Sequence, residues 1–172
     1  MLEEIRSLMV QQGFSCIHID SVCYKSHIFM RELLRQLLCL PRLNYENMFT
    51  DKDLENLLLK YGITFSNISL IHKFLWGKKK VELTLINDLI CQCIDKRPVK
   101  LPLFIEIDNI QSLDNEIQQF LIYLCTELSA KRSPVCFAFA LNTTLLKSEN
   151  KSPLIRYLKT MGIHKENVFI HP

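Results

Sequence analysis

The stretch Leu103-Phe104-Ile105-Glu106-Ile107-Asp108 decides the fold. It is a nearly continuous apolar run, and its acidic residues lie only toward its carboxyl end. A strand that is buried on both faces has this composition, and such burial is typical of parallel sheets. We therefore predict a buried parallel strand over residues 103–108.

Other segments of the chain are predicted to add strands to the same sheet. In residues 14–20, Ile17 and Ile19 alternate with less apolar positions, as in a strand with two unlike faces. A second apolar run predicts a strand over residues 135–141, and a short one predicts a terminal strand over residues 168–171.

Helices are predicted between these strands, because apolar residues recur there at intervals of three and four. The predicted helical ranges are 1–12, 25–40, 114–129 and 153–160. Residues 41–98 are expected to be mostly helical, with Asp51 as a helix N-cap and a second helical run over 81–94. Strands that alternate with helices indicate an α/β fold, a parallel sheet covered by helices on both faces.

No Gly/Ser linker divides the chain, so residues 1–172 are expected to form one domain.

Composition restricts the classes of function. The 172 residues include 21 basic and 18 acidic side chains, a net charge of +3, so any contact with DNA is expected to be local. The seven cysteines are odd in number and lie mostly in apolar stretches, which favours reduced thiols in the cytosol or nucleus. No stretch approaches the roughly 18 apolar residues of a membrane span, so no membrane contact is expected.

Polar residues follow the predicted strands at the points where those strands end. Asp20 closes the first strand, Glu106 and Asp108 close the buried strand, and Asn142 follows the next one. In doubly wound sheets, ligands bind beyond the carboxyl ends of the strands. These four residues are therefore the candidate site.

The order of these segments resembles that of AAA+ ATPases, and in particular of origin-recognition-complex subunits. Residues 17–37 resemble the second strand and following helix of those subunits, with 20–37 most similar to the fifth subunit. Residues 104–110 resemble the Walker B strand and residues 139–144 the sensor strand. Residues 168–172 resemble the strand that closes the ATPase core. The resemblance spans nearly the whole chain.

This resemblance implies a three-layer parallel sheet of the P-loop NTPase (AAA+) type. It implies a subunit or fragment of an origin-recognition-complex-like assembly that acts in the nucleus, in the initiation of DNA replication. The implied partners are other AAA+ subunits, with DNA reached through the complex. Glu106 and Asp108 would occupy degenerate Walker B positions and Asn142 a sensor position. ATP with magnesium would bind only in an assembly or in a longer chain.

The sequence departs from the family in two ways. It contains no G-x-x-x-x-G-K-[ST], and its four glycines cannot form the nest of backbone N–H groups that cradles phosphate. Ile105 stands where the magnesium ligand belongs, and general-base activation needs both halves of the acidic pair. The chain is therefore expected not to hydrolyse ATP. The phosphate-loop strand would lie upstream of Met1, which would leave the sensor strand with an unpaired apolar edge.

Other interpretations remain open from the sequence alone. A signalling ATPase fragment of the STAND type shares the strand order and would act through protein partners in the cytoplasm. An α/β enzyme unrelated to ATPases could use Asp20, Glu106 and Asp108 as a carboxylate cluster. In a purely structural role, the carboxylates cap the sheet, Asn142 forms a turn, and residues 78–80 are a solvated basic loop.

Overall fold

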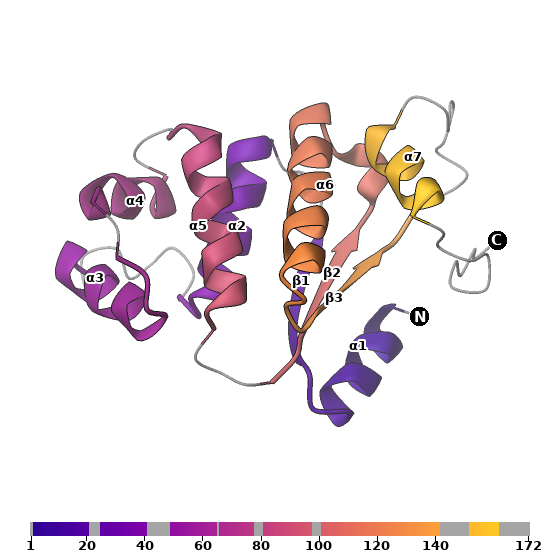
Figure 1. The fold of residues 1–172 in the computed structure, drawn as a ribbon, viewed down its shortest axis with the longest axis horizontal. Coiled ribbons are helices and arrows are strands. Elements are labelled where there is room, and N and C mark those ends of the chain that lie inside the picture. Colours follow the sequence, from indigo (N-terminus) through magenta and orange to yellow (C-terminus); the bar gives the residue numbers. More distant parts are fainter. Residues whose placement is uncertain are drawn as a thin grey trace.

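The computed structural model describes residues 2–20, 25–40, 49–64, 66–77, 81–97, 101–141 and 152–161. Three parallel strands form one open sheet in the order β1-β2-β3 within these residues (Figure 1). The strands are β1 Ser15–Asp20, β2 Leu103–Asp108 and β3 Val135–Phe139. The helices are α1 Leu2–Gln11, α2 Ser26–Leu37, α3 Asp51–Lys60, α4 Ile68–Leu75, α5 Leu83–Asp95, α6 Asn115–Ala130 and α7 Pro153–Thr160. The predicted α/β class is confirmed.

Strand β2 is the central strand, as its composition predicted. Its first five residues are buried, and Ile105 and Ile107 are fully enclosed. Neighbouring strands satisfy the backbone groups on both of its edges, and helices cover its side chains. The predicted bounds of this strand are those of the structure.

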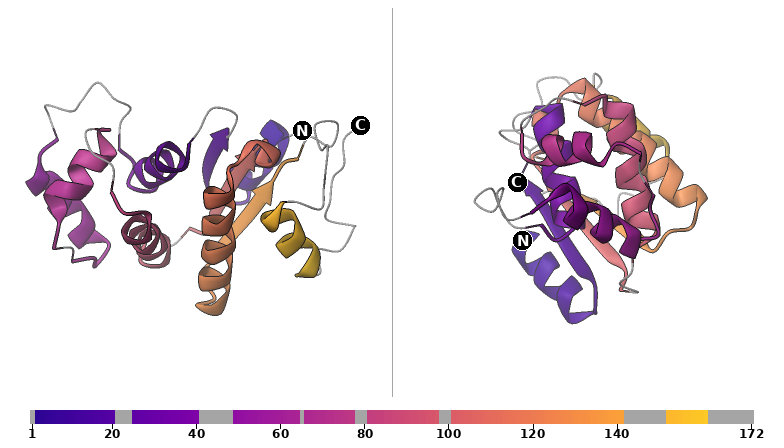
Figure 2. Two further views of the ribbon diagram at one scale, coloured as in Figure 1. Left: turned by 90° about the horizontal axis from the view of Figure 1, so that it is seen from above. Right: turned by 90° about the vertical axis from the view of Figure 1, so that its left-hand side faces the viewer.

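The main hydrophobic core lies on one face of the sheet. Ile17 and Ile19 of β1 join Ile105 and Ile107 of β2 in a single buried cluster with α2, α5 and α6. Helix α1 lies on the opposite face (Figure 2). On that face the thiol of Cys16 points to the backbone oxygen of Arg6 in α1. Side chains alternate between the two faces of a strand, so Cys16, His18 and Glu106 all belong to the face of α1.

Helices α3 and α4 lie at the side of the molecule away from the sheet (Figure 2). Thr50, and not the predicted Asp51, is the N-cap of α3. Its hydroxyl accepts from the backbone N–H of Asp53, whose carboxylate accepts from the backbone N–H of Thr50 at 2.8 Å. This reciprocal capping box satisfies two otherwise unpaired donors. The N-cap therefore lies one residue closer to the amino terminus than predicted.

Strand β3 is an edge strand among the described residues. It pairs with β2 on one side, and no other described strand pairs with it. Phe137 and Phe139 stack along it with ring centroids 5.9 Å apart, and both rings are only half-buried. Helix α7 packs against α6 beside this edge (Figure 1).

None of the helices in the described ranges is long and apolar enough to cross a bilayer. Three predicted features lie outside those ranges: the terminal strand over 168–171, Asn142, and the basic loop over 78–80.

Candidate functional site at the carboxyl edge of the sheet

Asp20 and Asp108 lie side by side at the carboxyl edge of the sheet. They are the last residues of β1 and β2 and are direct partners in the parallel register. The two strands are far apart in the sequence, and only their pairing brings the two carboxylates together. Asp20 and Asp108 are therefore the two candidate residues that the register makes neighbours.

Asn109 joins the two strand ends. Its side-chain amide donates to Oδ1 of Asp20 at 3.2 Å, and its backbone N–H donates to Oδ1 of Asp108 at 2.7 Å. Its backbone is left-handed, with φ 55° and ψ 42°, a conformation that asparagine tolerates better than most residues. Asn109 was not among the predicted site residues, although an asparagine directly after a strand is a common turn signal.

The amino ends of two helices border the same edge of the sheet. Asp114 is the N-cap of α6, where its Oδ1 accepts from the backbone N–H of Ile117 at 2.9 Å. Its Oδ2 accepts from the hydroxyl of Ser26, the first residue of α2, at 2.7 Å. Helix amino ends carry partial positive charge, which favours the carboxylates at this edge.

Glu106 lies apart from this edge, beneath α1. Its side chain is 1% exposed, its Oε1 lies 3.4 Å from Nδ1 of His18, and its Oε2 has no hydrogen-bond partner among the described residues. Burial raises the pKa of the Glu106 carboxyl, and His18 and Arg6 partly oppose that rise. Glu106 and Asp108 point to the same face of β2 but into different surroundings, and Asn142 lies outside the described residues.

A cavity of about 420 Å³ opens beside His18, between α1, β1 and α2. The side-chain amide of Gln36 lines this cavity and links α2 to β1. Its Nε2 donates to the backbone oxygen of His18 and to Oε1 of Glu32, both at 3.0 Å. The lining residues are Arg6, Cys16, His18, Glu32, Arg35, Gln36 and Leu40. Burial raises the pKa of the Cys16 thiol, and its Sγ points to backbone oxygens of Arg6 and Phe14. A protonated thiol held in this way is a poor nucleophile.

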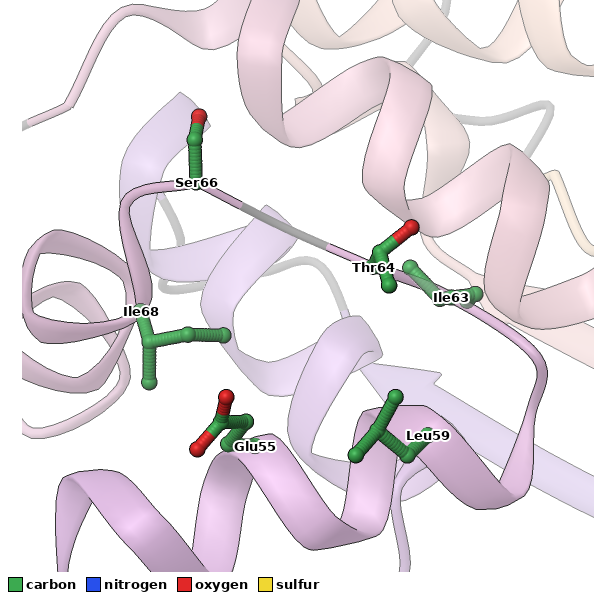
Figure 3. A pocket seen from close by; sticks show the side chains of 6 residues that line it. All are labelled: Glu55, Leu59, Ile63, Thr64, Ser66 and Ile68. Atoms are coloured by element: carbon green, nitrogen blue, oxygen red, sulfur yellow. The ribbon is translucent and has the colours of Figure 1, made fainter.

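A second cavity, of about 460 Å³, lies between α3 and α4, away from the carboxyl edge. Figure 3 shows Glu55 and Leu59 of α3 on one side of this space and Ile68 of α4 on the other. Glu55 is paired with Lys52 at 2.9 Å. The cavity holds none of the residues that the sequence selected.

The carboxyl edge can bind polar groups, but within the described residues no cluster of three or more His, Cys, Asp or Glu side chains is arranged to hold a metal ion. Searches of protein-family models, curated proteins and solved structures found no match to this chain.

Proposed function

We propose that the chain is a subunit, or a fragment of a subunit, of an origin-recognition-complex-like AAA+ assembly that initiates DNA replication. The observation that carries this proposal is the arrangement of the sheet. Strand β2, with its acidic end, lies between β1 and β3, and β3 has no second strand partner among the described residues. That free edge is where the sequence resemblance puts the phosphate-loop strand of a P-loop NTPase.

The composition of β3 supports an edge that associates with another protein. Residues 135–141 contain no charged side chain and no proline, the two devices that commonly protect an exposed edge. The half-buried rings of Phe137 and Phe139 add apolar surface beside the unpaired backbone. An edge of this kind is expected to be covered in the working assembly.

The geometry of β2 supports a subunit that does not hydrolyse ATP by itself. Ile105, at the position of the magnesium ligand, is fully buried and belongs to the core on the helix side. Glu106 is enclosed beneath α1 and lies against His18. Neither side chain is available to a magnesium-bound water at the strand end.

We infer that the partners are other AAA+ subunits in the nucleus and that DNA is reached through the complex. In this proposal, ATP with magnesium binds only where a neighbouring subunit or a longer chain supplies the phosphate loop. Asp108 would then be the acidic side chain that β2 presents at the carboxyl edge of the sheet.

The test is co-purification of the tagged chain with recombinant origin-recognition-complex subunits, followed by light scattering to measure stoichiometry. A defined complex is expected, and Cys136→Glu should weaken it at least tenfold, because this exposed side chain would put a charge on β3. Gln119→Glu, on the exposed side of α6, is the matched control and should bind like the wild type. Circular dichroism melts of both variants check that each one folds. Equal binding by both variants would exclude β3 as the contact, and no binding by the wild type would contradict the proposed function.

A further inference from the structure

His72 on α4 contacts two oxygen atoms, one with each ring nitrogen. Its Nδ1 lies 3.0 Å from Oδ1 of Asp51, the first residue of α3. Its Nε2 lies 2.7 Å from the backbone oxygen of Phe49. An ionised carboxylate and a backbone carbonyl can only accept hydrogen bonds.

A neutral imidazole carries one ring proton and could satisfy only one of these two oxygens. Its other nitrogen would then present a lone pair to the lone pairs of an oxygen at 3.0 Å or less. Both contacts are attractive only if both nitrogens carry protons. We propose that His72 is held as the imidazolium and acts as a pH-dependent clamp between α4 and the start of α3.

The surroundings of His72 fix the orientation of its ring. Phe49 stacks on it at 6.2 Å between centroids, and the ring of Trp76 lies 5.6 Å away. The His72 side chain is only 17% exposed. Phe49 and Trp76 also contact each other, with ring centroids 5.8 Å apart. A mostly buried ring in such a cluster cannot turn freely to exchange its partners, so its protonation state decides the strength of both contacts.

The charged groups around His72 act in opposite directions. Asp51 of α3 favours the imidazolium by direct contact. From α2, the guanidinium of Arg35 lies 5.0 Å from the centre of the Trp76 ring, and that of Arg31 lies 5.4 Å from the centre of the Phe74 ring. Lys73, the neighbour on α4, is exposed to solvent. Among these groups, Asp51 is the one in direct contact with a ring nitrogen of His72.

The clamp holds the segment that starts α3. Phe49 and Asp51 flank Thr50, whose capping box fixes the first turn of that helix. Imidazole side chains titrate between about pH 5 and 8. An imidazolium that loses one ring proton as the pH rises also loses the attraction of one of these two contacts. The start of α3 is then expected to open more often from α4, while at lower pH the clamp is closed.

Nuclear magnetic resonance of the full chain with ¹⁵N-labelled histidine tests the proposal. Both ring nitrogens of His72 should be protonated at pH 6, and Asp51→Asn should lower its titration midpoint. Glu55→Gln, which removes another carboxylate of α3, is the matched control and should leave the midpoint unchanged. One protonated nitrogen at pH 6, or equal midpoints in both variants, would overturn the proposal.

Amide hydrogen exchange tests the mechanical consequence. Corrected for intrinsic rates, exchange in the first turn of α3 should rise on the order of fivefold between pH 6 and pH 8, as expected for loss of a partly exposed ion pair. His72→Phe keeps an aromatic ring against Phe49 and Trp76 but has no ring proton, so its corrected exchange should not depend on pH. The same pH dependence in this variant would show that another group is responsible.

Discussion

Glu106 is a carboxylate buried beneath α1, with His18 near one oxygen and, within the described part of the chain, no hydrogen-bond partner for the other. Burial disfavours its charged form, and the pKa of Glu106 is accordingly raised. An acid whose pKa is higher in the folded state is ionised more readily when unfolded. Its effect on stability is absent at low pH and becomes unfavourable as the pH rises through the unfolded and then the folded pKa.

Glu106→Gln should therefore stabilise the chain at neutral pH and change little at acidic pH. The expected gain is about 1 kcal/mol at pH 7.5, because the amide carries no charge and can donate to a neighbouring acceptor. Urea unfolding at pH 4.5 and 7.5 measures it, with the exposed Glu82→Gln as the control. A loss of stability at pH 7.5 would show that the contact with His18 outweighs the cost of burial.

Asn109 combines a left-handed backbone with a link between two strand ends. Asn109→Gly removes the link and keeps the backbone conformation, whereas Asn109→Ala also places a Cβ in that conformation. Alanine should be less stable than glycine by about 1 kcal/mol in urea unfolding. Equal stabilities would mean that the turn relaxes to another conformation.

Glu106 and Asp108 were predicted as degenerate Walker B positions, a role that the structure does not test. They were selected by their place in the chain, and the register makes Asp20 and Asp108 neighbours. The pairing of Glu106 with His18 could not be predicted, because it depends on the register between β1 and β2. For the same reason, Asn109 was missed as the link to Asp20.

At the scale of elements, the amino end of α6 is tied to α2 through one side chain. Asp114 caps α6 and accepts from the hydroxyl of Ser26. Asp114→Ala should cost about 1–2 kcal/mol of folding stability, and Asp114→Asn clearly less, because asparagine keeps a capping oxygen. Thermal and urea melts of the two variants provide the comparison. Equal losses would show that the charge, and not the cap, is what matters.

Elements with strong local signals were predicted closely. The bounds of β2 and α7 match the prediction, because an apolar run ends at acidic residues in one case and a proline begins the helix in the other. In residues 41–98, the predicted helix after Asp51 and the predicted run over 81–94 correspond to α3 and α5, whereas α4 was not predicted as a separate helix. The position of α4 depends on its packing against α2 and α3, which local periodicity does not encode.

At the scale of the whole molecule, the proposal of a degenerate ATPase core makes a kinetic prediction. The purified chain should show no magnesium-dependent ATP turnover above a blank, and Glu106→Gln should leave that result unchanged. A coupled assay for ADP release measures it. Turnover that Glu106→Gln abolishes would contradict the proposal and favour an enzyme that uses this carboxylate.

Trp76 is the single tryptophan of the chain, and it lies between Arg35 of α2 and His72 of α4, away from the sheet. Its emission therefore reports on the helical side of the molecule, whereas far-ultraviolet dichroism reports on all of the secondary structure. If the two signals change together during denaturation, the helices around Trp76 and the sheet unfold as one cooperative unit. If the emission changes first, this side of the molecule is a separate foldon that opens while the sheet is still formed.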